Sequence, residues 1–163
     1  MTEELNLSQV IDFAVETEKL GEHMYKRLAS RFKDDAELHE LFETFAREET
    51  AHAARFETLR SLAKDLPSPS YEQKQYLRAV SLSDIFSDQN GVAKNIDQIK
   101  TREDALERAF RLEKTTLHYY QAVREFLDHE VVNEMIAEEK RHLTQVMKYM
   151  VTGAKMRGLG DKF

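Results

Sequence analysis

The sequence predicts an all-α fold, a four-helix bundle in which a long connection joins two antiparallel helix hairpins. Two observations lead to this prediction. The chain contains only 5 Gly and 2 Pro among its 163 residues, and its apolar residues recur with the 3.6-residue period of amphipathic helices over long stretches. With 41% apolar residues, a chain of this length can build one domain with a hydrophobic core but not two.

The first hairpin is expected in the first 66 residues. One helix should run from about Ser8, a suitable N-cap, to Arg31. The next should begin after Asp34 and Asp35, whose carboxylates suit a helix N-terminus, and should end before Leu66, which precedes a proline. Because the loop between them is very short, the two helices are expected to be antiparallel neighbours.

A long connection, residues 67–100, follows the first hairpin. It opens with Pro-Ser-Pro-Ser and contains short helical candidates at 71–78 and 82–87. A connection of this length can cross the length of a bundle, so the third long helix need not be antiparallel to the second.

The second hairpin begins with Thr101-x-x-Asp104, the pattern of a capping box that opens a helix. The short junction at Asp128 and His129 makes the last two helices antiparallel neighbours. The bundle is therefore expected to cover residues 1–151. Residues 152–163 contain three Gly and are expected to form a flexible C-terminal tail.

The pattern Glu-x-x-His occurs twice, as Glu49 with His52 and as Glu139 with His142. Residues at positions i and i+3 share one helix face, so the carboxylate and the imidazole can converge on one ion. In both stretches the pair interrupts an apolar stripe, and both pairs should therefore point into the core.

Two more carboxylates lie on apolar stripes, Glu18 in the first helix and Glu113 in the third. Each is followed seven residues later by a tyrosine, Tyr25 and Tyr120. Each hairpin thus supplies one lone Glu and one Glu-x-x-His pair, which is an internal repeat of candidate ligands.

Four inward carboxylates and two inward imidazoles need a counter-charge, because each unpaired buried charge would cost several kcal/mol of desolvation. Two divalent cations are the simplest answer, and oxygen ligands with imidazole suit iron or manganese. The basic residues that flank these positions point about 100° or more away on a 3.6-residue helix; they are Lys19, Arg47, Lys114 and Arg141.

The composition excludes several classes of site. The chain has no Cys, which excludes disulfides, thiolate catalysis and four-cysteine metal sites. A net charge of -6, with basic and acidic residues interleaved, argues against a nucleic-acid partner. No segment approaches the roughly 18 to 20 apolar residues needed to span a bilayer, so we expect a soluble cytoplasmic protein without a membrane partner.

These segments together resemble the ferritin-like diiron carboxylate proteins, and most of all the diiron domain of rubrerythrin, over nearly the whole chain. The matching pieces are Glu18-x6-Tyr25, residues 45–52 (Phe-Ala-Arg-Glu-Glu-Thr-Ala-His), Ala105-Leu106 with Glu113-x6-Tyr120, and residues 137–142 (Ala-Glu-Glu-Lys-Arg-His). The resemblance implies two iron ions per chain, with manganese or zinc as substitutes.

The resemblance also implies a role for each residue: Glu49 and Glu139 bridge the two ions, Glu18 and Glu113 bind one ion each, His52 and His142 cap them, and Tyr25 and Tyr120 donate hydrogen bonds to the carboxylates. The implied activity is an oxidoreductase that reduces H2O2 or O2. The implied partners are a separate electron-donor protein, such as a rubredoxin-type protein, and a second copy of the chain in a homodimer.

Two departures from the family pattern bear on the activity. Rubrerythrins carry Glu-x-x-Glu on the third helix, where that second Glu accompanies a redox-dependent shift of one iron, but Thr116 stands at this position here. The rubredoxin module is also absent from the sequence. The usual peroxidase chemistry therefore does not follow from the resemblance alone.

Three function classes stay open: a diiron oxidoreductase, a ferritin-type subunit that oxidises or stores iron, and a structural bundle that binds zinc or another ion without catalysis. Without a metal, the Glu-x-x-His pairs would be solvated helix faces or buried ion pairs. Glu48 and Glu138, which precede the candidate ligands, are expected to be surface residues.

Overall fold

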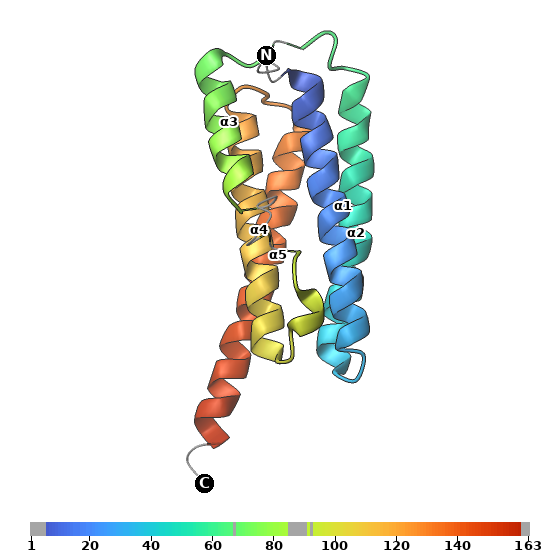
Figure 1. Cartoon of the computed structure of the whole chain (residues 1–163), viewed down its shortest axis with the longest axis vertical. Helices are drawn as coiled ribbons and strands as arrows, with labels where there is room; N and C mark the ends of the chain where they lie inside the picture. The colour runs from blue at the N-terminus through green and yellow to red at the C-terminus, as the bar shows by residue number, and fades with distance from the viewer. Residues whose placement is uncertain (1–5, 67, 85–90, 92, 161–163) are drawn as a thin grey trace.

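The computed structural model describes residues 6–66, 68–84, 91 and 93–160, and all regular structure within these residues is helical. Four long helices form a bundle (Figure 1): α1 (Leu7–Arg31), α2 (Ala36–Arg60), α4 (Arg102–Arg124) and α5 (Glu130–Gly160). A shorter helix, α3 (Tyr71–Asp84), and a 3-10 turn, η1 (Ile96–Gln98), lie in the connection between α2 and α4. The predicted all-α bundle is confirmed.

Local capping determines where the first two helices begin. At the start of α1, the Asn6 side chain accepts a hydrogen bond from the Gln9 amide at 2.9 Å, while the Gln9 side chain accepts one from the Asn6 amide at 2.8 Å. The N-cap is therefore Asn6, and the prediction of Ser8 was wrong by two residues, because this reciprocal pair satisfies two amides at once. Asp35 caps α2 by accepting from the Leu38 amide at 3.1 Å.

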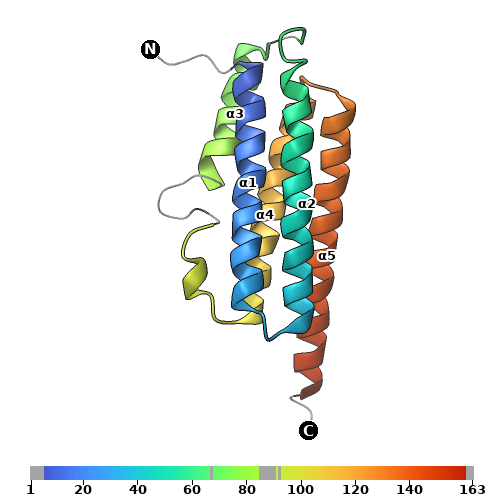
Figure 2. The same ribbon diagram turned by 90° about the vertical axis from the view of Figure 1, so that its right-hand side faces the viewer.

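The long helices pack as two antiparallel hairpins, α1 with α2 and α4 with α5, as predicted. Figure 1 shows the two hairpins side by side, and in Figure 2, turned by 90°, α4 lies behind α1 and α2. The connection after α2 carries the chain back along the bundle, so α4 runs parallel to α2 (Figure 1). The long crossover expected at residues 67–100 is thus present.

The crossover packs against the bundle at two places. α3 lies along α4, with Leu77 buried, and η1 lies against α1, with Ile96 buried. Arg27 pairs with Asp97 across the contact between α1 and η1. α3 includes the predicted helix at 71–78 and the first part of the one at 82–87, whose residues 85–87 lie outside the described part of the chain.

The last helix is longer than predicted. α5 continues to Gly160, so the stretch expected to be a flexible tail from residue 152 is helical as far as the structure describes it. The lower end of α5 projects past the rest of the bundle (Figure 1). Each Gly costs about 1 kcal/mol in a helix, but no proline interrupts this stretch, and extending an existing helix is easier than starting a new one.

The core is divided into two apolar clusters along the bundle axis. One contains Met24 and Phe42 and the other contains Ile11 and Phe56. Between them lies a layer of buried polar side chains: Thr17, Glu18, Glu49, His52, Glu113, Thr116, Glu139 and His142. None of the described helices is both long and apolar enough to cross a membrane.

Candidate metal centre

The four long helices bring all six candidate ligands together in the polar layer. Each long helix follows its apolar stripe from one core cluster to the other, and the charged residues occupy the turns between. The six residues are at most 4% exposed: Glu18, Glu49, His52, Glu113, Glu139 and His142. A single inward face of each helix is enough to assemble them.

The six residues form two overlapping groups. Within each group one ligand atom per residue can be chosen so that all lie within 4.8 Å of one another. The groups are Glu18, Glu49, His52 and Glu139, and Glu49, Glu113, Glu139 and His142. Glu49 and Glu139 belong to both, so each group offers three carboxylates and one imidazole.

The imidazoles present the same nitrogen to the carboxylates. His52 Nδ1 lies 3.3 Å from Glu18 Oε2 and 3.4 Å from Glu139 Oε1. His142 Nδ1 lies 3.3 Å from Glu113 Oε2 and 3.5 Å from Glu49 Oε1. Both Nδ1 atoms therefore face the centre of the bundle.

Two tyrosines connect the hairpins through the lone glutamates. Tyr25 on α1 donates a hydrogen bond to Glu113 Oε1 on α4, and Tyr120 on α4 donates one to Glu18 Oε1 on α1. Burial, and then the charge of Glu113, raises the pKa of Tyr25, so this phenol stays a donor. Each lone Glu thus has one oxygen bound to a tyrosine and the other directed at a histidine.

The metal-free site retains protons. Burial, and then the nearby charge of Glu49, raises the pKa of Glu18, and burial with the charge of Glu113 raises the pKa of Glu139. Burial alone would lower the pKa of His52, but its contacts with Glu139, Glu18 and Glu49 outweigh this and raise it to about 12. The protons compensate charge that a bound cation would otherwise compensate.

Several buried atoms of the site have no hydrogen-bond partner: Glu18 Oε2, His52 Nδ1 and both carboxylate oxygens of Glu139. An unsatisfied buried polar group costs about 1–3 kcal/mol. Carboxylate oxygen and imidazole nitrogen are ligands for iron, manganese and zinc. The residues therefore fit divalent cations, and the cluster is one that could bind metal.

Gly21 provides the space that Glu49 occupies. A Cβ at position 21 would lie 3.2 Å from both Cδ and Oε2 of Glu49. Such a contact is closer than normal van der Waals packing allows, so a side chain here would displace the carboxylate. The glycine lets α1 pass directly over a residue that belongs to both groups.

Glu48 is a residue of the site that the sequence analysis missed. The prediction that it is a surface residue was wrong: its side chain is 31% exposed, and Oε2 lies 2.8 Å from His142 Nε2 across the α2–α5 contact. The hydrogen bond with His142 is the main reason that the pKa of Glu48 falls to about 2. A Glu before each candidate ligand was visible in the sequence, but the adjacency of α2 and α5 was not.

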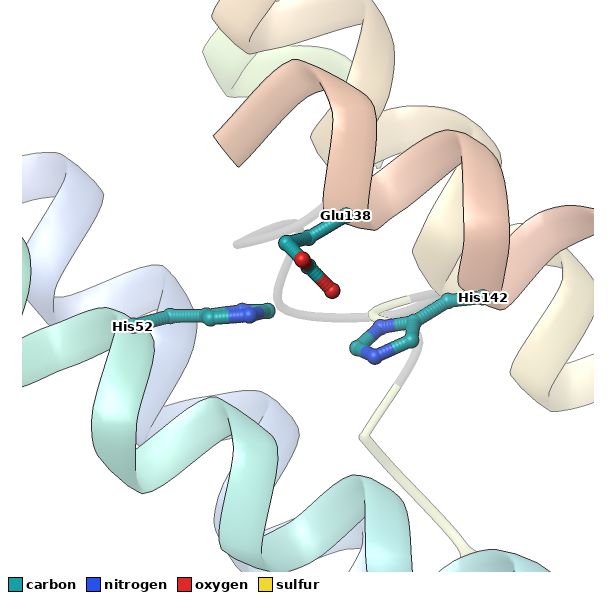
Figure 3. A group of neighbouring side chains, drawn as sticks. All are labelled: His52, Glu138 and His142. Carbon is teal, nitrogen blue, oxygen red and sulfur yellow. The ribbon is translucent and has the colours of Figure 1, made fainter. Parts of the chain in front are cut away.

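Glu138, the equivalent residue on α5, lies near both imidazoles. Figure 3 shows His52 and His142 reaching toward one another from α2 and α5, with the Glu138 side chain extending between them. The Glu138 carboxylate is bound by Arg141 at 2.9 Å, and the two histidines already belong to the groups described above. These three residues do not form an independent site.

The position three residues after Glu113 holds a neutral side chain. Thr116 is buried, and its hydroxyl donates a hydrogen bond to the Leu112 carbonyl at 2.9 Å. The hydroxyl is thus satisfied by its own helix, and no fifth carboxylate enters the ligand set from this position.

The sequence was compared with models of known protein families, with curated proteins and with solved structures. The rubrerythrin family model matches residues 9–90, about half of the chain, which include most of α1 and all of α2 and α3. Comparisons with curated proteins and with solved structures gave no match. The matched region contains Glu18, Glu49 and His52, and the fold adds the corresponding residues of α4 and α5. The chain belongs to the rubrerythrin family.

Proposed function

We propose that this protein is a non-haem diiron oxidoreductase that reduces H2O2 or O2. The observation that carries the proposal is the pair of overlapping ligand groups that share Glu49 and Glu139. Two groups with two common carboxylates suit two metal ions held close together, an arrangement in which each ion can supply one electron to an O–O bond.

In this proposal each metal position takes residues from both hairpins. Glu18 and His52 would hold one ion, Glu113 and His142 would hold the other, and Glu49 and Glu139 would be available to both. Iron is the proposed native metal, and manganese or zinc could substitute for it. When bound, two iron ions supply two electrons to the oxidant.

The side chains of the protein balance the charge of the metal, hold its ligands in place and limit the access of water. Four carboxylates balance the charge of two divalent ions, and Tyr25 and Tyr120 hold the lone glutamates in place through hydrogen bonds. The apolar clusters above and below the polar layer limit the access of water. Because these carboxylates lose their protons when they bind a cation, the protons that the reduction consumes come from solvent.

Reduction of H2O2 to two water molecules consumes two electrons and two protons. The 163 residues contain no Cys for an iron–sulfur or rubredoxin-type centre, and we propose that a separate protein, of the rubredoxin type, donates the electrons. A homodimer in solution, in the cytoplasm, completes the proposal.

The first test is the metal content per chain after anaerobic loading with Fe(II). We expect close to two irons in the unmodified protein and a large loss in Glu49→Ala and in Glu139→Ala, because each removes a shared ligand. Oxidation of the loaded iron by H2O2 is then followed by stopped-flow absorbance. Undiminished peroxide-driven oxidation in Glu49→Ala would refute the assignment.

A second candidate function is iron oxidation of the ferritin type, in which Fe(II) is the substrate. The neutral Thr116, in place of the extra carboxylate of rubrerythrins, is the observation that favours it. Turnover of many Fe(II) ions per chain with O2, together with a particle of many subunits on a sizing column, would support this function. A dimer that consumes peroxide only while an electron donor is present would support the first proposal.

A further inference from the structure

The two halves of the metal centre differ in the residues that surround the outer ring nitrogen, Nε2, of each histidine. Residues 48–52 read Glu-Glu-Thr-Ala-His and residues 138–142 read Glu-Glu-Lys-Arg-His. Glu48 and Glu138 are therefore equivalent by position, whereas Ala51 on α2 corresponds to Arg141 on α5. The difference between Ala51 and Arg141 changes the surroundings of both imidazoles.

His142 is held at both ring nitrogens. Its Nδ1 faces the carboxylates of the centre, and its Nε2 lies 2.8 Å from Glu48 Oε2. The other oxygen of Glu48, Oε1, lies 2.8 Å from Arg141 Nη2, so this carboxylate is itself fixed. The ring also stacks on Phe45, with centroids 4.3 Å apart.

His52 lacks this support. Its Nδ1 faces the centre, but within the described residues its Nε2 has no hydrogen-bond partner. Glu138 is the carboxylate that could play the part of Glu48, and it lies close enough to belong to one cluster with both histidines. Arg141 instead binds Glu138 through both Nε and Nη2, each at 2.9 Å.

A carboxylate on the outer nitrogen of a metal-binding histidine has known consequences. It keeps the proton on Nε2, leaves the lone pair on Nδ1, fixes the ring orientation and increases the basicity of the ligand. Loss of such a partner costs about 10- to 100-fold in metal affinity. A supported and an unsupported histidine in one centre should therefore bind metal unequally.

We infer that Glu48, held by Arg141, is a positioning residue for His142, and that the metal position of Glu113 and His142 fills before that of Glu18 and His52. This inference rests on the proposed diiron site. Arg141 acts on both positions, because it secures the partner of His142 and binds the Glu138 carboxylate, which could otherwise pair with His52. The expected difference in metal affinity thus comes from residues where α2 meets α5 and not from the six ligands themselves.

The test is a titration of the metal-free protein with Co(II) under anaerobic conditions, followed by visible absorbance and calorimetry. In the unmodified protein we expect two binding steps whose affinities differ by about tenfold or more. In Glu48→Ala the tighter step should weaken by about 10- to 100-fold. Glu138→Ala, the matched control at the equivalent position, should leave the tighter step unchanged.

Two further variants assign the steps to the two positions. His52→Ala should remove the weaker step and keep the tighter one, and adding Glu48→Ala to it should weaken the step that remains. Arg141→Ala should reduce the difference in affinity between the two binding steps, because it releases the carboxylates of both Glu48 and Glu138. Circular dichroism of each variant checks that the helices are intact.

The outcomes of the titration distinguish failure of the unequal filling from failure of the proposed diiron site. Two equal steps in the unmodified protein, or a loss in Glu48→Ala no larger than in Glu138→Ala, would overturn the unequal filling and leave the diiron site standing. Absence of any Co(II) binding in the unmodified protein would overturn the diiron site itself. Two unequal steps, with only the tighter one sensitive to Glu48, would support both.

Discussion

Glu49 is the residue whose placement constrains the centre most, because it belongs to both ligand groups and has a helix backbone directly against it. Gly21 makes this possible: a Cβ there would lie 3.2 Å from the Glu49 carboxylate. Glycine in a helix interior costs about 1 kcal/mol relative to alanine. A glycine is nevertheless present where the α1 backbone lies against the candidate ligand Glu49.

The variant Gly21→Ala should therefore separate stability from metal binding. In the metal-free protein, we expect the gain in helix propensity to raise the midpoint of thermal unfolding by about 2–4 °C, because the Glu49 side chain can shift by a few tenths of an ångström. Metal affinity should fall by about tenfold, since the displaced carboxylate serves both positions. Thermal melts with a chelator and a Co(II) titration measure the two effects.

Gly153→Ala is the matched control for this prediction. Gly153 lies in α5, and nothing lies within 4 Å of where its Cβ would be. The control should gain stability without any change in metal affinity. Equal metal affinity in Gly21→Ala and Gly153→Ala would show that Glu49 is not constrained by α1.

At the scale of elements, the centre connects the two hairpins. The group around His52 takes residues from α1, α2 and α5, and the group around His142 takes residues from α2, α4 and α5. The tyrosine hydrogen bonds also run from one hairpin to the other. A cation in either group would thus tie α1–α2 to α4–α5.

We therefore expect Zn(II), which avoids redox chemistry, to stabilise the folded bundle. A ligand that binds only the folded state at 100 times its dissociation constant adds about 2.7 kcal/mol. For a chain of this size, that corresponds to roughly 5–10 °C in the midpoint of thermal unfolding. Differential scanning calorimetry with and without zinc measures the shift.

The control for this prediction is Glu49→Gln, which keeps the size of the side chain but removes a charge from both groups. Its midpoint should respond much less to zinc, and a chelator should return the unmodified protein to its starting value. A shift of the same size in Glu49→Gln would place the zinc elsewhere on the molecule.

At the scale of the whole molecule, burial of six ionisable groups links folding to pH. Glu18 and Glu139 have pKa values raised well above 4.5, and His52 has a pKa raised from 6.5 to about 12. A group whose pKa is raised in the folded state contributes stability that is present below its unfolded pKa and is lost as pH rises. The glutamates and the histidine therefore act in the same direction.

The metal-free protein should accordingly lose stability between pH 7 and pH 9. In this window the unfolded chain has neutral His52, while the folded chain retains the His52 proton, and the raised pKa values of Glu18 and Glu139 act in the same direction. The lowered pKa of Glu48, about 2, contributes no change there, because that carboxyl is ionised in both states. Urea unfolding in the presence of a chelator at several pH values measures the slope.

Metal binding should show the opposite dependence on pH. A cation must displace the protons that the metal-free site retains, so affinity should rise with pH and binding should release protons. Calorimetry in buffers of different ionisation enthalpy counts these protons. Stability of the metal-free protein that is constant from pH 7 to pH 9, with no protons released on binding, would contradict this account.

Much of the molecule could be predicted from the sequence because the information is local. The 3.6-residue apolar stripes identified four long helices, and the position of Glu18, Glu49, Glu113 and Glu139 on those stripes put the carboxylates inside. Short loops made hairpins, and the length of the crossover allowed α4 to run parallel to α2. Residues three apart on one helix must share a face in any packing.

The errors occurred where local signals compete or where two helices meet. Ser8 and Asn6 are both suitable caps, and only the reciprocal bonds of Asn6 with Gln9 decide between them. The glycines after Val151 suggested a tail, yet the helix continues to Gly160. In both cases the preference of a single residue was outweighed by its neighbours.

By itself, the sequence determined the helices, the inward direction of the six candidate ligands and the membership of a family of diiron proteins. Only the tertiary structure decided which residues contact these ligands. Gly21 packs against Glu49, the two tyrosines donate hydrogen bonds to glutamates of the other hairpin, and Glu48 is hydrogen-bonded to His142. The physical reason is that a helix period specifies which face a residue occupies, whereas the partner that it meets depends on which helices pack together and at what height.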